Sequence, residues 1–501
     1  MQVVLTINPS DPRTLQRQLF DQIRGLILEN KLRSGDPVPA SRALSEQLGV
    51  SRNTVMLAYE QLLNEGYIES RPNVGTFVSS SLPEKGMLIA LRAAEERQAN
   101  NNNGDVRPLP DRLKGHTVIS PNRGRLEHDF WIGRVDASTF PANEWRRILD
   151  AKVRYGGARL AEYQDPQGLP ELRQAIADHI GPARGVSAGA DDIVIVAGSQ
   201  GGLDLIARAL AGHARTFVHE DPCYQGARSL FEGCGLKPVP VAVDHDGIDV
   251  ARLPETRRNL LYVTPSHQYP LGVTLSLERR LALLEWAART DSYVIEDDYD
   301  GDFRYEGAPL TALRGLDCRG RVLYLGTFSK SLAAGLRLGF IVAPPALART
   351  LKEWKSLTSN GNPWLVQSAM ADFMHSGGFM RHLRRIRAIY RQRRDTLVEA
   401  LRPAFGDAEF KGMRGGMHVS LRLPPRFGDA REIERRAAAR GVGVYVPGSG
   451  GAFVTPGNPR ARDTLLFGYA ALSERSIAIA AGRLAQAVAE GADGAKDAAD
   501  G

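Results

Sequence analysis

A single lysine, Lys330, stands among small and hydroxyl-bearing residues in the segment "GTFSKSLAAGLRLGF" (326–340), directly after an apolar run. Taken alone, a Ser-Lys pair in this position is typical of a solvated loop. A lysine held at the end of a buried strand can instead act as a nucleophile and form a Schiff base with an aldehyde. The neighbouring segments distinguish these two interpretations.

A carboxylate and a phenol follow the end of another predicted strand. The run "SYVIEDD" (292–298) predicts a strand that ends near Asp297, and Tyr299 comes two residues later. Because the carboxyl ends of parallel strands lie at one edge of a sheet, we expect these side chains close to Lys330. Pyridoxal phosphate (PLP), an aldehyde cofactor, needs a carboxylate at its ring nitrogen and a partner for its ring hydroxyl. Asp297 and Tyr299 are the candidates for these two roles.

Groups suited to a phosphate and to ring stacking are also present. The segment "AGSQGGLDL" (197–205) predicts a strand-turn-helix junction, and a helix N-terminus binds anions. The candidate phosphate ligands are Ser199, Gln200, Thr327, Ser329 and Arg337, and Tyr224 in "EDPCYQG" (220–226) is the candidate to stack on the ring. Each segment alone has an ordinary explanation, but their order and spacing together predict a PLP site.

The elements that position these residues alternate between strand and helix. The predicted strands are residues 192–198, 259–265, 292–298 and 321–328, and the clearest helices between them are 202–212 and 277–290. This alternation predicts an α/β domain with a largely parallel sheet. We expect the domain to span residues 126–490, with a large lobe at about 150–370 and a smaller α+β lobe at about 371–490.

The first 80 residues follow a different pattern. Apolar residues at helical spacing from Leu15 to Ile27 predict an amphipathic helix. The segment 41–70 predicts a short helix, a turn, and a second helix capped by Ser51, and residues 67–78 predict two strands around a turn. We therefore expect an α+β winged helix-turn-helix over residues 10–80, followed by a polar linker at 81–125. The alternative is a small helical domain that contacts another protein.

Both parts resemble known families. Residues 15–78 resemble the winged helix-turn-helix of the GntR regulators, and residues 129–487 resemble the fold-type-I aminotransferases. The motifs that carry the second resemblance are "YQDPQG" (163–168), "TPSHQYPLG" (264–272), "EDDYDGDFRY" (296–305) and "GTFSKSLAAGLRLG". The whole chain resembles the MocR-type subfamily of GntR regulators, which joins these two parts.

The resemblance implies roles for individual residues. It implies that Lys330 forms the Schiff base with PLP, and that Tyr163 reaches the phosphate in the partner subunit of a homodimer. The residues implied to contact double-stranded DNA are Arg42, Ser51, Arg52, Asn53, Thr54 and Gly75. Their chemistry agrees, because hydroxyls and amides at a helix N-terminus bind phosphate and an arginine can read guanine. Met56 departs from the pattern, since some family members carry an arginine there.

The expected function is transcriptional regulation. A PLP-binding regulator would bind a DNA operator and sense PLP, or an amine that forms an aldimine with PLP, with at most a residual aminotransferase half-reaction. The alternative is an active PLP-dependent aminotransferase with a fused DNA-binding module. The net charge of +7 suits an anionic partner.

We expect a cytoplasmic protein without a membrane partner, because the N-terminus lacks signal-peptide features and no apolar run is long enough to span a bilayer. Three cysteines without ligand spacing predict neither a disulfide nor a metal site.

Two further segments bear on function. In the related families an arginine just before a Leu-Gly-Phe sequence clamps a substrate carboxylate, and here Leu466 occupies that place in "TLLFGYAAL" (464–472). We therefore expect PLP itself, or an amine with a different tail, as the effector, unless Arg414, Arg460 or Arg462 substitutes. The arginine-rich segment 381–394 predicts a helix with a core-facing side, and the alternative is a secondary DNA track.

Overall fold

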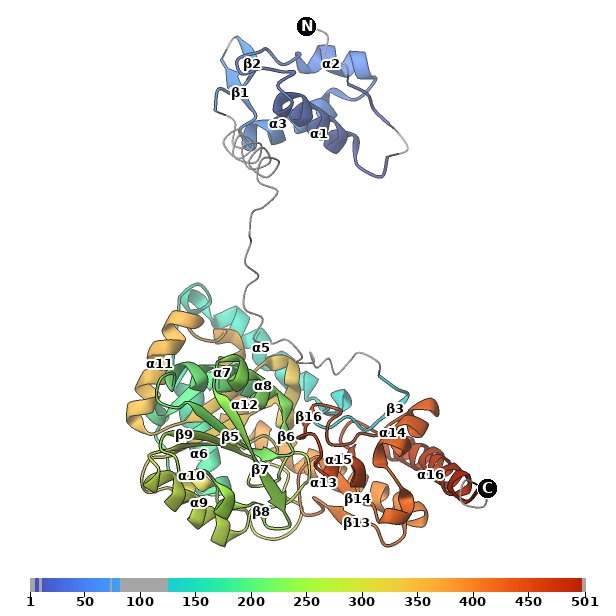
Figure 1. The fold of residues 1–501 in the computed structure, drawn as a ribbon. Helices are drawn as coiled ribbons and strands as arrows, with labels where there is room; N and C mark the ends of the chain where they lie inside the picture. Colours follow the sequence, from blue (N-terminus) through green and yellow to red (C-terminus); the bar gives the residue numbers. More distant parts are fainter. Residues whose placement is uncertain (1–4, 9–10, 73, 82–124, 498–501) are drawn as a thin grey trace, which may run out of the picture. The chain divides into compact units, whose positions relative to one another are not determined.

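The computed structural model describes residues 5–8, 11–72, 74–81 and 125–497, and the chain divides into two compact units, Met1–Pro110 and Asp111–Gly501 (Figure 1). The predicted linker, residues 81–125, lies outside the described residues except at its two ends. None of the described helices is both long and apolar enough to cross a membrane.

The N-terminal unit is a winged helix-turn-helix, as predicted. Its elements are α1 (Leu15–Leu28), α2 (Ser41–Leu48), α3 (Arg52–Asn64), β1 (Ile68–Arg71) and β2 (Gly75–Val78), and the two strands pair antiparallel. The turn between α2 and α3 contains Gly49 at a φ of 65°, a conformation that favours glycine. The Ser51 side chain accepts a hydrogen bond from the Thr54 amide at 3.1 Å and so caps α3.

A single apolar core holds the three helices of this unit together. Leu19, Ile23 and Ile27 of α1 are buried together with Val55 and Leu62 of α3, as their spacing predicts. Leu15 is exposed, contrary to the pattern, because it stands at the first position of α1. The same helical spacing leaves the first turn of α3 facing solvent.

The second unit is built on an eight-stranded sheet. Its strands, in spatial order, are β4 (Ile193–Val196), β12 (Gly339–Val342), β11 (Val322–Thr327), β10 (Tyr293–Asp298), β9 (Asn259–Val263), β5 (Thr216–Asp221), β7 (Lys237–Asp244) and β8 (Gly247–Ile248). Only β12 and β8 run antiparallel to their neighbours. The prediction of a largely parallel α/β sheet is therefore confirmed.

Helices cover both faces of this sheet (Figure 1). They are α5 (Ala142–Tyr155), α6 (Pro170–Arg184), α7 (Gly198–Ala209), α8 (Gln225–Gly233), α9 (Leu277–Arg289), α10 (Leu313–Leu316), α11 (Pro345–Thr358) and α12 (Trp364–His375). Alternate residues of β4 enter different cores, Val194 on one face and Ile195 on the other. A Cβ on Gly202 would come within 2.5 Å of the Leu325 side chain, so the absence of a side chain lets α7 lie directly on β11.

The C-terminal part forms a smaller lobe around the antiparallel sheet β13-β14-β17. Its elements are α13 (Gly378–Phe405), β13 (Glu409–Lys411), β14 (His418–Arg422), α14 (Ala430–Ala439), β15 (Val442–Gly443), β16 (Ala452–Phe453), α15 (Arg460–Asp463), β17 (Thr464–Gly468) and α16 (Glu474–Asp497). Two short pairings join it to earlier segments: β15 runs parallel to β3 (His128–Asp129), and β16 pairs with β6 (Cys223–Tyr224). The second pairing brings the small lobe next to Tyr224.

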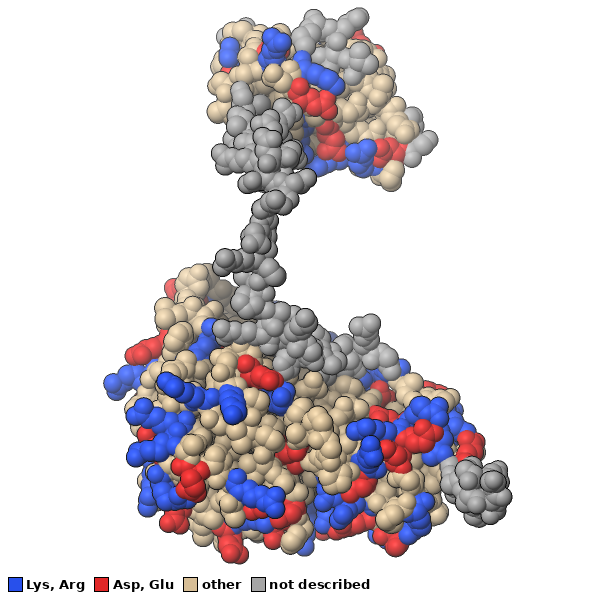
Figure 2. Space-filling view, viewed as in Figure 1, with Lys and Arg blue, Asp and Glu red and all other residues tan. Residues whose placement is uncertain are grey.

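The arginine-rich segment lies in α13, with the predicted apolar side in the core. Arg393 and Arg394 are buried; Arg393 pairs with Asp136 at 2.7 Å, and Arg394 pairs with Glu306 at 3.2 Å. Arg384 and Arg391 are exposed. Basic and acidic side chains are interspersed on the face of the second unit in Figure 2. Because Arg394 is internal, a continuous DNA track along this helix is not supported.

Candidate functional site

One cavity of about 350 Å³ gathers nearly all of the residues predicted to contact PLP. It lies at the carboxyl ends of β10 and β11, as the strand arrangement predicts. The predicted residues that line it are Ser199, Gln200, Tyr224, Asp297, Tyr299, Thr327, Ser329, Lys330 and Arg337. Tyr163 is the exception, because its side chain is 88% exposed and lines no part of this cavity.

Lys330 lies on a single helical turn, Ser329–Ala333, that follows β11. Its Nζ donates a hydrogen bond to the Gly133 carbonyl oxygen at 2.8 Å. A Cβ on Gly133 would come equally close to that nitrogen, and the φ of 85° there also favours glycine. Burial lowers the pKa of Lys330, against the opposing effect of Asp297. A lysine with a lowered pKa is more often the neutral, nucleophilic amine.

Asp297 is the next-to-last residue of β10, and its two carboxylate oxygens differ in their hydrogen bonding. Oδ2 accepts a hydrogen bond from the Tyr262 hydroxyl at 2.7 Å. Oδ1 is buried and has no hydrogen-bond partner among the described residues. Burial raises the pKa of Asp297 to about 7, although the Tyr262 hydrogen bond works in the opposite direction. An unpartnered buried oxygen at the cavity wall fits the protonated ring nitrogen of PLP.

The anion-binding end of the cavity is formed by α7 and Arg337. Ser199 and Gln200 lie in the first turn of α7, where backbone N–H groups and the helix dipole favour negative charge. Arg337 adopts a φ of 49° and donates from Nη2 to the Ala197 carbonyl at 2.8 Å, which holds its guanidinium beside that helix terminus. Thr327 donates to the Ser329 hydroxyl at 3.0 Å. These groups fit a phosphate.

Aromatic rings form the wall next to this anion site. The Tyr224 hydroxyl donates to the Gln200 amide oxygen at 3.3 Å, and its ring packs edge-on to Tyr269. Tyr269 in turn packs edge-on to Tyr299, with 5.9 Å between ring centroids. Leu466 is buried in the same apolar cluster as Tyr269. Leu466, which stands where an arginine that binds a carboxylate is expected, therefore packs in an apolar cluster with Tyr269 of the cavity wall.

None of the substitute arginines lines the cavity. Arg460 pairs with Asp463 at 3.3 Å, and Arg462 pairs with Asp429 at 3.7 Å. Arg414 lines a different cavity. Among the residues that line the cofactor cavity, Lys330 and Arg337 are the cationic ones.

Several lining residues were not anticipated from the sequence. They are Trp131, Ile132, Gly133, Tyr262, Tyr269, Gly450 and Gly451. Tyr269 lies within the "TPSHQYPLG" motif, so this motif could have indicated that Tyr269 lines the cavity. Tyr262 lies within an apolar strand and resembles an ordinary core residue there. The Trp131–Gly133 and Gly450–Gly451 segments carry no local signal, because only tertiary packing brings them to the site.

The residues implied to contact DNA surround the start of α3. Ser51, Arg52 and Asn53 are exposed, and Arg52 makes no ion pair with the described residues. Thr54 is half-buried, and its hydroxyl lies 2.8 Å from that of Ser51. Arg42 on α2 is exposed and pairs with Glu46, while Gly75 opens β2 on the exposed wing. Arg52 and Asn53 are therefore the side chains with most freedom to reach a ligand.

Apolar side chains are exposed in the segments just before Tyr163 and on α11. Val153 and Tyr155 on α5, Leu160 and Leu357 are between 49% and 81% exposed. The loop that follows α11 passes close by, since a Cβ on Gly361 would lie 3.7 Å from the Asp165 carbonyl oxygen. An exposed apolar patch of this kind is typical of an interface with another protein.

Comparison with known proteins agrees with both units. Residues 15–78 match the family "Bacterial regulatory proteins, gntR family", and residues 136–484 match "Aminotransferase class I and II". The chain is 34% identical to the probable rhizopine catabolism regulatory protein MocR of Rhizobium meliloti, over 92% of this chain and 91% of that protein. It is also 34% identical to the pyridoxine biosynthesis transcriptional regulator PdxR of Corynebacterium glutamicum, over 83% of this chain and 85% of that protein.

A solved structure shows the same fold in the second unit. It is LysN, the α-aminoadipate aminotransferase of Thermus thermophilus, in complex with N-(5'-phosphopyridoxyl)-L-leucine. The match has a TM-score of 0.67 and 29% identity, and it covers 76% of this chain and 97% of that one.

The raised pKa of Asp297 generates a test of this site. In cofactor-free protein the native state keeps this carboxyl protonated to a higher pH than the unfolded chain does, so stability falls as the pH rises through that interval. The Asp297→Asn substitution removes the buried charge and keeps an acceptor for Tyr262. We expect the variant to be roughly 2–4 kcal/mol more stable than wild type at pH 8, with a smaller gain at pH 5. Unfolding midpoints across this pH range measure the difference, and a gain independent of pH would contradict the assignment.

Proposed function

This chain belongs to the MocR-type group of GntR regulators, which joins a winged helix-turn-helix to an aminotransferase-like domain, and we propose that it controls transcription in response to PLP or to an amine that reacts with bound PLP. It is a transcriptional regulator with an aminotransferase-like domain. The observation that carries the sensing proposal is the cavity that combines Lys330 with the unpartnered oxygen of Asp297.

The aminotransferase-like domain binds PLP. When bound, PLP supplies an aldehyde that reacts reversibly with amines and a ring that withdraws electrons. The Lys330 amine, whose pKa is lowered by burial, is the group placed to attach to it. Asp297 would hold the proton of the ring nitrogen through Oδ1, and Tyr299 would bind the ring hydroxyl. The first turn of α7 with Arg337 would hold the phosphate, and Tyr224 would pack against the ring.

The apolar wall at Ile132 and Tyr269, with Leu466 in the same apolar cluster, favours sensing over catalysis of amino-acid transamination. An unpaired carboxylate against this wall would pay a desolvation penalty of at least a few kcal/mol. Arg337 is the one arginine among the described residues that line the cavity, and it lies beside the anion site at α7. No arginine is therefore left to bind a substrate carboxylate there. We therefore propose PLP itself, or an amine without an α-carboxylate, as the effector. A working aminotransferase is the less favoured alternative, and sustained turnover of an amino acid with a keto acid would identify it.

A homodimer completes the proposal. The exposed apolar side chains just before Tyr163 and on α11 would be covered by a second copy, and Tyr163 would then reach the phosphate site of the partner subunit. Two subunits would present two winged helix-turn-helix units to paired half-sites of an operator in the cytoplasm. Ligand exchange in the cavity and DNA binding would be coupled reciprocally, so that operator DNA changes effector affinity by the same factor as effector changes DNA affinity.

The first prediction concerns Lys330. Borohydride reduction of the PLP-loaded protein should fix the cofactor covalently, and peptide mapping should place the label on Lys330. Lys355 is a matched internal control, because it is also buried and burial lowers its pKa to about 7, but it lies outside the cavity. Lys330→Ala should abolish the label. A label on Lys355, or one that survives in Lys330→Ala, would show that the assignment is wrong.

The second prediction concerns Arg52. Arg52→Ala should weaken binding to a selected operator by roughly 1–3 kcal/mol, the contribution of one bidentate base contact, and leave PLP binding unchanged. Arg33→Ala is the matched control, since it removes an exposed arginine from the same unit away from α3. Fluorescence anisotropy with operator and scrambled DNA measures the DNA affinity of both variants. An equal loss of operator affinity in Arg52→Ala and Arg33→Ala would mean that DNA binding depends only on the net charge of the unit.

The third prediction concerns the effector. Titration of the PLP-loaded protein with α- and γ-amino acids, taurine and polyamines should show that ligands lacking an α-carboxylate change the cofactor spectrum and operator affinity most. Leu466→Arg places a guanidinium at the apolar wall and should increase affinity for α-amino acids by about tenfold or more. Tight, carboxylate-dependent binding of an α-amino acid to wild type, without improvement in Leu466→Arg, would contradict the proposal.

A further inference from the structure

The acidic run at the end of β10 faces two different sites. Asp297 and Tyr299 line the cofactor cavity. Asp298 instead pairs with Arg184 at 2.7 Å, and Asp300 accepts a hydrogen bond from His267 Nδ1 at 2.8 Å. Asp297 and Asp298 face opposite sides as successive residues of β10, and Tyr299 and Asp300 lie in the bend that follows the strand. The residues that serve the cofactor therefore share a backbone with residues that face a second site.

A second cavity, of about 400 Å³, lies on that other side. It is lined by the loop 266–274, by residues 300–304 and by residues 410–416 of the small lobe. Its charged lining is mostly basic: Arg184, Arg304, Lys411 and Arg414, against one carboxylate, Asp300. A cavity lined in this way concentrates anions.

Two of these cations have no acidic partner. Arg184 is balanced by Asp298, and Lys411 by Glu409. Arg304 and Arg414 make no ion pair with any described residue, and Arg304 Nε is buried without a hydrogen-bond partner. Burial lowers the pKa of Arg304, and repulsion from Arg414 lowers it further. Glu306 acts in the opposite direction but is already paired with Arg394.

The backbone holds the two arginines close together. Residues 303–305 and 414–416 pair in antiparallel fashion: the Tyr305 amide donates to the Arg414 carbonyl at 3.0 Å, and the Gly416 amide donates to the Phe303 carbonyl at 2.7 Å. This pairing fixes the main chain of the two arginines side by side. Two like charges held together without a counter-charge are stabilised by an anion placed between them.

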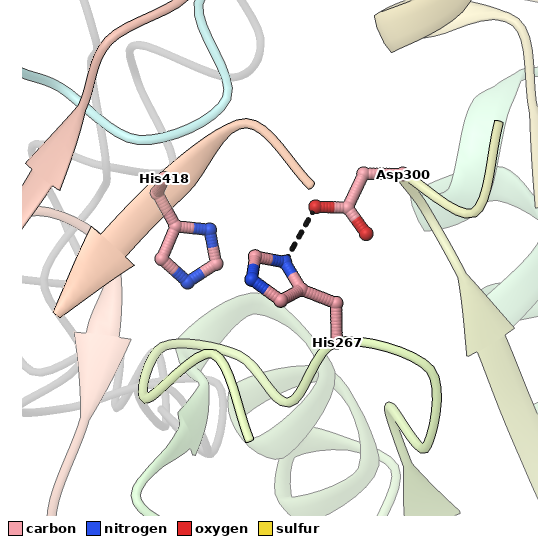
Figure 3. A group of neighbouring side chains, drawn as sticks. All are labelled: His267, Asp300 and His418. Atoms are coloured by element: carbon pink, nitrogen blue, oxygen red, sulfur yellow. Dashed lines mark hydrogen bonds and ion pairs between the residues drawn. The ribbon is translucent and has the colours of Figure 1, made fainter. Parts of the chain in front are cut away.

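A buried imidazole supplies a third polar group (Figure 3). His267 is 94% buried, and with Nδ1 donating to Asp300, its Nε2 has no partner among the described residues. A Cβ on Gly412 would come within 2.8 Å of this Nε2, so glycine backbone forms the cavity floor beside it. The Nε2 atom of His267 and the Nε atom of Arg304 are thus two buried polar atoms that the described residues leave without a hydrogen-bond partner.

His267, Asp300 and His418 could together also be read as a cation site, since their ligand atoms lie within 4.8 Å of one another. The ring of His418 lies 4.4 Å from that of His267, and its Nε2 is bonded to the Pro270 carbonyl. The single carboxylate is already bonded to His267, and three arginines line the same cavity. These charges favour an anion over a metal ion.

We propose that this second cavity binds a small oxyanion, the phosphate or carboxylate group of a metabolite, at a site separate from the PLP cavity. Arg304 and Arg414 would bind its oxygens from the two lobes, with His267 at the floor. The Tyr299 hydroxyl donates to the His267 carbonyl at 3.0 Å, so the occupant would lie one residue away from a PLP contact. The two ligands are thereby placed to affect each other. This site does not depend on the proposed role in transcription.

The test is calorimetric titration of sulfate, inorganic phosphate and malonate into PLP-loaded full-length protein, with chloride adjusted to constant ionic strength. PLP already fills the phosphate site at α7, so that site does not contribute. We expect one saturable site per chain, weakened about tenfold or more by Arg304→Gln and by Arg414→Gln. Arg391→Gln removes an exposed arginine outside the cavity and should leave binding unchanged.

The ligand class follows from the same titrations. Preference for sulfate and phosphate would identify a phosphate ester, and preference for malonate would identify a carboxylate. Neither Arg304 nor Arg414 forms an ion pair with an acidic group among the described residues, so the variants should fold, which the spectrum of bound PLP and circular dichroism verify. No saturable binding, equal weakening by Arg391→Gln, or binding that occurs only without PLP would overturn the proposal. Zinc binding that requires His267 and His418, in place of oxyanion binding, would also overturn it.

Discussion

The burial of an acid and an amine at the ends of two parallel strands is the constraint on which this site depends. Strands β10 and β11 pair in register, Asp297 beside Leu325, so that the chain after each strand enters the same cavity. Burial raises the pKa of Asp297 and lowers that of Lys330, which makes both groups costly for the protein to keep without a ligand. Each pKa unit corresponds to about 1.4 kcal/mol. A ligand with a protonated ring nitrogen and an aldehyde satisfies both groups.

The surrounding structure keeps these groups in place by close backbone approach. The carbonyl of Gly133 reaches Nζ of Lys330 only because the glycine has no side chain. Gly202 lets α7 lie on β11, which brings the helix terminus to the anion site. Tyr262 bonds one oxygen of Asp297 and leaves the other directed at the ligand. The polar ends of the cavity are therefore preorganised, while Ile132 and Tyr269 of its wall belong to an apolar cluster that also contains Leu466.

The same strand end also connects the cavity to the second, cationic one. Asp298 at the end of β10 pairs with Arg184, and Asp300, two residues beyond the strand, is hydrogen-bonded to His267. The second cavity lies between the two lobes, and its arginines come from both of them. A ligand there would act on the relative placement of the lobes and on Tyr299 together. Such an arrangement suits a protein whose output is a change of conformation.

The sequence by itself determined the two folds and most of the cofactor site, because those signals are local. Strand runs, helix periodicity and the cap at Ser51 depend on near neighbours in the chain, and residues that follow parallel strands must meet at one sheet edge. Tertiary structure alone decided which distant segments close the cavity, such as Trp131–Gly133 and Gly450–Gly451, and that Arg394 is internal. It also decided that Arg304 and Arg414 line one cavity and form no ion pair with the described residues. Charge balance depends on contacts between residues far apart in the chain, and no local pattern encodes them.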